Sequence, residues 1–176
     1  EAVKELIRTL GIAVIQQEGH EADDIIAGIA AAAAQAGDRV FIVTGDKDLL
    51  QMLSERIRIL HPADGSVRDV AWFRSTYGFD PCHIPDYLAL AGDASDNIPG
   101  VRGIGEKTAG SLVKKFGTLE RIYEKIDEVT PPRVQQLLRA GWQDAFASRE
   151  LVLLRPVVPA GCDPAGFRAG KPDRAK

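Results

Sequence analysis

Two short apolar runs rich in β-branched residues, separated by a stretch of alanine and isoleucine, constrain the fold of this chain most. Residues 12–16 (IAVIQ) and 40–44 (VFIVT) have the length and composition of buried strands. Between them, residues 23–36 have the composition of a well-packed helix, and Gly37 provides its stop. Strand–helix–strand alternation predicts a parallel sheet with flanking helices, the α/β class.

Further elements follow from the same patterns. Residues 3–10 form an apolar stripe at helical spacing before Gly11, and residues 47–53 suit a short helix. Residues 56–60 alternate like a strand with one solvated face, and an Asp-Gly pair at 64–65 supplies turn chemistry before residues 66–70. After residue 69 the pattern is almost entirely helical, with helices expected over 70–77, 84–91, 105–116, 119–127, 132–140 and 143–151.

Local signals place the ends of these helices and the borders between regions. Asp69 and Thr118 stand where N-caps belong, and Pro85 suits a first helical turn. The tail after Pro159 is rich in proline, glycine and alanine without periodicity, which is typical of a linker or a disordered end. We therefore expect an α/β core over 1–75, a helical region over 76–158, and a tail over 159–176.

Composition excludes several classes of protein. No apolar run approaches the roughly 18 residues that span a bilayer, so a membrane protein is not expected. Cys82 and Cys162 lie far apart and outside any CxxC spacing, which indicates neither a disulfide framework nor a zinc site and favours a reducing, cytoplasmic setting.

The formal net charge of −3 conceals two oppositely charged halves. Residues 1–97 carry 16 Asp and Glu against 8 Lys and Arg, net −8, and residues 98–176 carry 9 against 14, net +5. An acidic half joined to a basic half is the asymmetry that a function has to explain.

Three acidic clusters lie at junctions between the expected elements. They are Glu21, Asp23 and Asp24 at the start of the alanine-rich helix, Asp46 and Asp48 after the second strand, and Asp93 and Asp96 after the helix at 84–91. The first two clusters fall at the ligand-binding edge of a parallel sheet, where crowded carboxylates repel one another unless a hard cation such as Mg²⁺ or Mn²⁺ binds them. Taken alone, the first cluster is equally compatible with a helix N-terminus and the second with an ordinary loop. The spacing of Asp93 and Asp96 is more typical of a solvated helix end than of metal ligands.

The basic half contains a glycine-rich segment, IPGVRGIGEKTAGSLVKK, that leads into a helix starting near Glu106. Its glycines allow backbone N–H groups to face an anion at a helix N-terminus, and its cations can follow a nucleic-acid backbone without reading bases. The alternative is a tight helix–turn–helix with a merely solvated basic face. The candidate phosphate-binding residues are Gly100, Arg102, Gly103, Gly105, Lys107, Thr108, Lys114 and Lys115.

Four motifs in this order, EADD, TGDKD, LAGDASDN and GVRGIGEKTA, closely resemble the 5′ nuclease domains of bacterial DNA polymerases I and the related flap endonucleases. The resemblance runs from the first residue to about Pro159. It implies a PIN-like α/β core followed by a helix–three-turn–helix DNA-binding region. The implied activity is structure-specific hydrolysis of DNA at 5′ ends and flaps with two Mg²⁺ or Mn²⁺ ions.

The resemblance also implies roles for individual residues. Asp24, Asp46 and Asp48 become the catalytic carboxylates, and all seven acidic residues of the three clusters become metal ligands. The GVRGIG segment becomes the element that holds duplex DNA, often with a K⁺ ion on its backbone carbonyls. The implied partners are flap, nicked or gapped DNA and, in the polymerase I arrangement, a polymerase domain after the tail.

The chain also departs from this family. The first strand of the family, which carries a metal-binding Asp, and the basic helical arch that follows it have no counterpart here. We therefore expect the chain to be a fragment of a longer nuclease of bacterial or phage-like origin. The missing central strand would expose a sheet edge, which predicts a dimer. The alternative hypothesis is a non-catalytic duplex-DNA-binding module derived from the same family.

Overall fold

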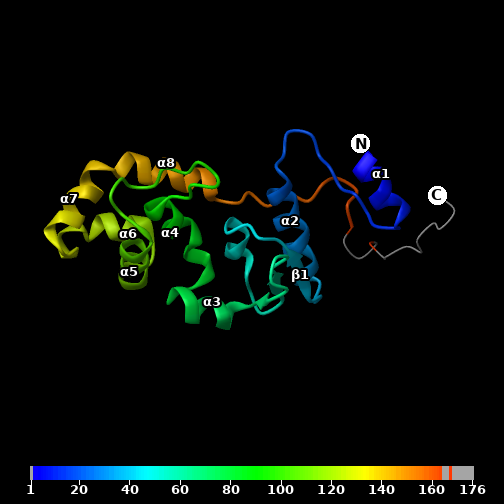
Figure 1. Ribbon diagram of the computed structural model, residues 1–176, viewed down its shortest axis with the longest axis horizontal. Coiled ribbons are helices and arrows are strands. Elements are labelled where there is room, and N and C mark those ends of the chain that lie inside the picture. The colour runs from blue at the N-terminus through cyan, green and yellow to red at the C-terminus, as the bar shows by residue number, and fades with distance from the viewer. Residues whose placement is uncertain (1, 164–166, 168–176) are drawn as a thin grey trace. The chain divides into compact units, whose positions relative to one another are not determined.

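The computed structural model describes residues 2–163 and 167 (Figure 1). By internal contacts the chain divides into two compact units, Glu1–Val40 with Arg155–Lys176, and Phe41–Leu154. These units are not the regions 1–75 and 76–158 expected from the sequence, whose borders remain predictions. Of the expected tail over 159–176, residues 164–166 and 168–176 lie outside the described residues.

The first unit contains the helices α1 (Ala2–Thr9) and α2 (Ala22–Gln35). Helix α1 ends before Gly11, whose φ of 74° is the left-handed conformation of a helix stop, as predicted. In α2, Gly28 allows the backbone of Val157 to approach closely, because a Cβ there would lie 2.1 Å from the Val157 carbonyl oxygen. The Val157 N–H donates to the Asp24 carbonyl at 2.9 Å, which fixes this segment on the helix.

The strand expected at residues 12–16 is wrong, because these residues adopt no regular secondary structure. A strand requires a paired neighbour, and within the described residues no other strand pairs with this run. Ile12 is 54% exposed, so the β-branched run is not buried as a central strand would be. Composition alone indicated a strand whose partner the described structure does not supply.

The sheet has the strand order β1 (Val40–Val43), β2 (Ile57–Leu60) and β3 (Val67–Arg68). Strands β2 and β3 pair antiparallel in the register Ile59 with Arg68 and Leu60 with Val67. The turn between them is closed by the Gly65 N–H, which donates to the His61 carbonyl at 2.9 Å. This hairpin agrees with the turn signal at 64–65 and departs from a purely parallel sheet, because so short a turn cannot make the crossover that parallel strands need.

The helices after residue 69 follow the predicted pattern closely. Asp69 caps the helix Val70–Tyr77, because its carboxylate accepts from the Trp72 N–H at 2.8 Å. Thr118 caps the helix Leu119–Glu124, because its hydroxyl accepts from the Arg121 N–H at 3.3 Å. The expected helix at 47–53 is a 3₁₀ helix, η1 (Asp48–Met52), and that at 119–127 divides in two near Lys125. The full set is α3 (Val70–Tyr77), η2 (Pro81–His83), α4 (Ile84–Ala91), α5 (Glu106–Phe116), α6 (Leu119–Glu124), η3 (Ile126–Glu128), α7 (Pro132–Ala140) and α8 (Trp142–Val152).

Helix α4 is the centre of the second unit. All of its residues from Ile84 to Leu90 are buried, including the charged Asp86, and it packs against α5 and α8 (Figure 1). Its C-terminal end leads directly into the acidic residues at 93 and 96, so the packing of α4 determines where that cluster lies. Among the described helices, none has both the length and the apolar character that crossing a bilayer requires.

Candidate nucleic-acid interface and acidic clusters

The acidic pair after β1 is held by short-range hydrogen bonds. The Thr44 hydroxyl oxygen accepts from the Asp46 N–H at 3.0 Å, and the Asp46 carboxylate accepts from the Asp48 N–H at 2.9 Å. These bonds turn the chain sharply at the end of the strand and lead into η1. Both carboxylates are half-buried, so the TGDKD sequence forms a defined turn in which they have fixed positions.

The second acidic pair differs in burial, because Asp93 is 4% exposed and Asp96 is exposed. One carboxylate oxygen of Asp93 accepts from the N–H and the hydroxyl of Ser95, and the other lies 3.0 Å from the Lys47 ammonium. Burial alone would raise the pKa of Asp93, but the hydrogen bonds from Ser95 and Lys47 lower it below its ordinary value. Reciprocally, the hydrogen bond to Asp93 raises the pKa of Lys47.

The acidic pair and the glycine segment belong to one tightly closed loop. Asp93 and Ile98 form a two-way backbone bridge, with N–H to carbonyl distances of 3.0 and 2.8 Å. Gly92 and Gly100 approach so closely that a Cβ on Gly100 would lie 2.3 Å from the Gly92 nitrogen. Gly100 has φ of 60°, so both its conformation and its surroundings require glycine. The position of the acidic pair is therefore coupled to that of the candidate DNA-binding turn.

The glycine segment is supported from behind by α7 and α8. The Gly100 N–H donates to the hydroxyl of Ser148, a fully buried residue of α8, at 3.2 Å. A Cβ on Gly141 would lie 2.8 Å from the Val101 side chain, so the junction of α7 and α8 also packs closely on this loop. Sequence analysis did not identify Ser148, since nothing local distinguishes it from an ordinary helical serine.

The predicted phosphate-binding cations lie on the outer surface of this loop and of α5. Arg102, Lys107 and Lys114 are exposed, whereas Lys115 is exposed but already donates to the Glu128 carbonyl at 3.0 Å. Gly105 occupies the N-cap position of α5 and provides no side-chain capping bond to the first N–H groups of the helix. The remaining predicted residues of the segment are Gly100, which is buried, Gly103, which is exposed, and Thr108, which is half-buried.

The EADD cluster lies in the first unit, at the N-terminus of α2. Glu21 is the exposed N-cap residue and makes no side-chain capping bond, and Asp23 and Asp24 lie in the first turn. The Asp24 carboxylate accepts from the Arg155 N–H at 2.7 Å, so it helps to fix the returning segment near residue 157. Asp24 thus has a structural contact in addition to its predicted role.

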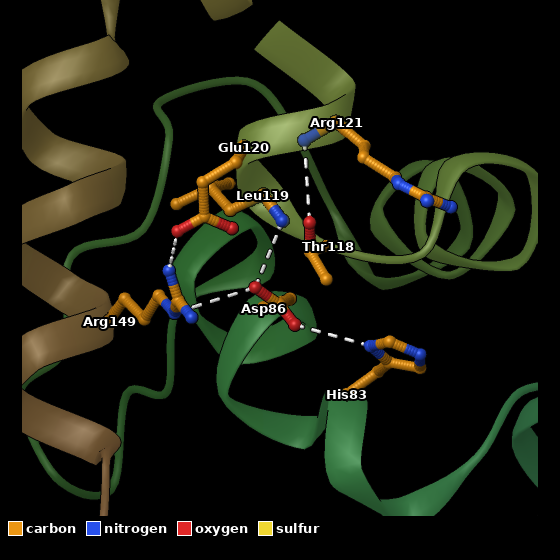
Figure 2. Close-up of polar contacts among 7 residues, drawn as sticks. All are labelled: His83, Asp86, Thr118, Leu119, Glu120, Arg121 and Arg149. Carbon is orange, nitrogen blue, oxygen red and sulfur yellow. Dashed lines mark hydrogen bonds and ion pairs between the residues drawn. The ribbon is translucent and has the colours of Figure 1, made fainter. Parts of the chain in front are cut away.

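A charge network centred on the buried Asp86, which the motifs did not reveal, joins helices of the second unit (Figure 2). The Asp86 carboxylate of α4 accepts from the Leu119 N–H at 2.9 Å and lies 3.3 Å from His83 Nδ1 and 3.5 Å from Arg149 Nε. Arg149 also pairs with Glu120. The network connects α4, the start of α6 and α8, and α8 also supports the glycine segment through Ser148.

The described arrangement does not by itself form a metal cage. Among the described residues of each unit, no three His, Cys, Asp or Glu side chains come together as possible metal ligands. In the second unit, Lys47 and Ser95 occupy the oxygens of Asp93 that a cation would need. The chemistry of the donors suits Mg²⁺ or Mn²⁺, but their placement within each unit does not yet fit one.

Comparison with known proteins places both parts of the chain in one family. Residues 1–78 match the family model described as "5'-3' exonuclease, N-terminal resolvase-like domain", and residues 79–175 match "5'-3' exonuclease, C-terminal SAM fold". A thermostable DNA polymerase I of Thermus thermophilus is 45% identical over 161 residues, which is 92% of this chain and 19% of that protein. DNA polymerase I of Mycobacterium tuberculosis is 39% identical over 97% of this chain and 19% of its own length. The chain thus spans about a fifth of the length of these relatives.

Solved structures agree on the fold. The 5′-exonuclease of T5, in a structure described as having zinc bound, matches with a TM-score of 0.69 and 26% identity over 80% of this chain and 52% of that one. The catalytic core of Rad2, in complex with a DNA substrate, matches with a TM-score of 0.64 and 21% identity over 97% of this chain and 59% of that one. The α/β class, with a PIN-like core followed by a helical domain of SAM fold, is therefore confirmed.

Proposed function

Because the chain belongs to the 5′–3′ exonuclease family, we propose that it takes part in structure-specific hydrolysis of DNA phosphodiester bonds, as a 5′→3′ exonuclease and flap endonuclease. The observation that supports this most is the closed loop from Gly92 to Ile104. It connects the acidic pair at 93 and 96 to the glycine segment, which would place the proposed cleavage site and the proposed DNA-holding surface on one support. The nuclease core is proposed to end near residue 75, the helical region near 158, and a tail to follow.

We assign catalysis and metal binding to the acidic side chains. Asp24, Asp46 and Asp48 are the proposed catalytic carboxylates, and the proposed metal ligands are Glu21, Asp23, Asp24, Asp46, Asp48, Asp93 and Asp96. The zinc in the T5 exonuclease structure supports dependence on a divalent metal, and the all-oxygen donor set favours two Mg²⁺ or Mn²⁺ ions. Among the described residues of either unit, these carboxylates do not come together, so we assign them as ligands without assigning a geometry to the ions. A metal ion that binds Asp93 would have to displace the Lys47 ammonium.

We assign DNA binding to the basic half of the chain. The exposed Arg102, Lys107 and Lys114 and the uncapped start of α5 suit a duplex backbone, with a K⁺ ion proposed on the carbonyls of the glycine turn. The proposed substrates are 5′-flap, nicked or gapped duplexes. The bacterial DNA polymerase I relatives support a cytoplasmic setting and a polymerase domain as a covalent neighbour.

A dimer through the sheet edge is a separate part of the proposal. Strand β1 ends the strand order, and Phe41 and Val43 on its outer face are 51% and 63% exposed. Among the described residues this edge pairs with no further strand, and an edge strand with an apolar face favours pairing with a second chain. Multi-angle light scattering should give a mass that rises with concentration towards twice 19.0 kDa. A constant monomer mass would refute this part alone.

The nuclease proposal is tested with a fluorescent 5′-flap oligonucleotide and Mg²⁺ or Mn²⁺. Labelled product should accumulate, and chelation with EDTA should stop it. Asp46→Asn and Asp96→Asn should abolish cleavage while fluorescence anisotropy shows unchanged DNA binding, because each removes a ligand charge and preserves shape. Asp38→Asn, at an exposed position outside the motifs, is the matched control. Turnover that is unchanged in both motif variants would refute the ligand assignment.

The second candidate is a non-catalytic duplex-binding module, favoured by the Lys47–Asp93 ion pair and by the lack of a ligand group within either unit's described residues. The same assay separates the two candidates, since binding without any product in either metal supports the module. In both cases Lys107→Ala should weaken duplex binding and lower the slope of log affinity against log salt by about one. Arg133→Ala, exposed on α7, should change neither quantity.

A further inference from the structure

A cavity of about 620 Å³ opens in the second unit beside α4. Its walls come from the end of α3, from α4, from the first three turns of α5 and from Lys47. Pockets that bind small organic ligands usually have volumes of about 300–1,000 Å³. The cavity is therefore large enough for a ligand that combines a ring system with a charged group.

One wall is a fixed aromatic cluster formed by Tyr77, Phe79 and Tyr87. The ring centroids are 5.8 Å apart for Tyr77 and Phe79, 5.8 Å for Tyr77 and Tyr87, and 5.6 Å for Phe79 and Tyr87. A Cβ on Gly110 would lie 4.0 Å from the Tyr87 ring, so a larger residue there would narrow the cavity. Mutual packing holds the rings in place, so a planar ligand would meet a preformed apolar surface.

The polar part of the lining consists mainly of hydrogen-bond donors. Burial raises the pKa of Tyr87 to about 12 and also raises that of Tyr77, so both phenols remain protonated near neutral pH. In the described part of the chain, neither hydroxyl makes a hydrogen bond, and neither Lys107 nor Lys114 forms an ion pair. Lys47 also lines the cavity, but Asp93 already balances its charge.

The chemistry of this lining selects one class of ligand. Two ammonium groups without an ion pair among the described residues, together with two phenol hydroxyls, suit the several acceptor oxygens of a phosphate ester. Glu106, the one carboxylate of the lining, can accept from a sugar hydroxyl or a base amino group. We propose that the cavity binds a nucleotide, with its phosphate at Lys107 and Lys114 and its base against the aromatic wall.

This site rests on the proposed function only through Lys107 and Lys114, which also belong to the proposed duplex-binding surface. The nucleotide has two possible sources, a free nucleoside monophosphate or a nucleotide within a DNA strand. Both present the same phosphate, sugar and base to the cavity. The tyrosines distinguish the cavity from the duplex surface, because neither is assigned a contact with duplex DNA.

Isothermal titration calorimetry of the whole chain with thymidine 5′-monophosphate tests the site. Saturable binding is expected, with inorganic phosphate and unphosphorylated thymidine each binding more weakly because each lacks one half of the ligand. Lys114→Ala should weaken binding about tenfold through loss of a charge-assisted hydrogen bond, and Tyr77→Phe about threefold through loss of a neutral one. Circular dichroism of each variant verifies that it has folded, and the Phe side chain preserves the ring packing.

Competition and duplex binding complete the test. Displacement of the monophosphate by a short single-stranded oligonucleotide identifies a strand nucleotide as the ligand, and failure of displacement identifies the free nucleotide. Tyr77→Phe should not alter duplex affinity, whereas Arg102→Ala, outside the cavity lining, should weaken duplex binding and not the binding of the monophosphate. The proposal is overturned if binding does not saturate at about 10 mM thymidine 5′-monophosphate, a concentration above the dissociation constants of ordinary weak complexes. It is equally overturned if inorganic phosphate binds as tightly as the monophosphate, or if both cavity variants bind like the wild type, whatever the duplex assay shows.

Discussion

Replacement of Asp86 should destabilise the second unit far more than replacement of any surface carboxylate. Asp86 is 3% exposed and sits where α4, α6 and α8 meet (Figure 2). Asp86→Ala leaves the buried Leu119 N–H without its acceptor at 2.9 Å, which costs about 1–3 kcal/mol. It also deprives Arg149 of one anion, and breaking a buried ion pair costs about 3–5 kcal/mol.

The second cost is reduced in this case, because Arg149 keeps its ion pair with Glu120 and its side chain is 26% exposed. We therefore expect a total loss of about 3–4 kcal/mol for Asp86→Ala. Asp86→Asn should lose only about 2 kcal/mol, because its amide oxygen can still accept from the Leu119 N–H. Against a typical stability of about 5–15 kcal/mol, both losses are readily measured.

Urea unfolding followed by circular dichroism measures these losses, with tryptophan fluorescence from Trp72 and Trp142 as a second probe. Asp80→Asn is the matched control, because Asp80 pairs with Arg74 at 2.5 Å but both side chains are more than half exposed. Such a pair contributes about 0–1 kcal/mol. The reasoning is refuted if Asp86→Ala costs no more than the control, or if Asn at position 86 costs as much as Ala.

Three further outcomes are expected. Burial would raise the pKa of Glu120, but hydrogen bonds from its own backbone N–H and from Arg149 lower it below the ordinary value of 4.5. The stabilisation that Glu120 provides is therefore complete above pH 4.5 and is lost as the pH falls through the lowered pKa. Urea unfolding at about pH 6 and about pH 3 should therefore show Glu120→Gln approaching wild type at the lower pH; a gap that widens on acidification would contradict this sign. Gly28→Ala should destabilise the chain despite the roughly 1 kcal/mol higher helix propensity of alanine, because the Cβ would collide with the Val157 carbonyl, and thermal unfolding decides the sign. Ser148→Ala should lower the free energy of unfolding by about 1–2 kcal/mol and weaken duplex binding, because the Gly100 N–H loses its acceptor. If fluorescence anisotropy shows unchanged duplex binding while stability falls, Ser148 does not position the glycine turn for DNA.

The sequence alone determined the helices and the motifs that indicate the family. Helices with capping residues and glycine stops form where they were predicted, because their hydrogen bonds lie within the segment, as in the caps at Asp69 and Thr118. The order of the acidic and glycine motifs was likewise sufficient to indicate the family. These are local properties of the chain, which neighbouring residues can specify without the rest of the fold.

Only the tertiary structure decided features that depend on a distant partner. The run at 12–16 has a strand's composition but not its pairing, since a strand exists only where another one accepts its hydrogen bonds. The Asp86 network joins residues 33 positions apart, and Ser148 reaches Gly100 across 48, so no local pattern could reveal either. The same holds for the ion pair of Lys47 with Asp93 and for the aromatic cavity beside α4, which exist because packing brings remote segments together.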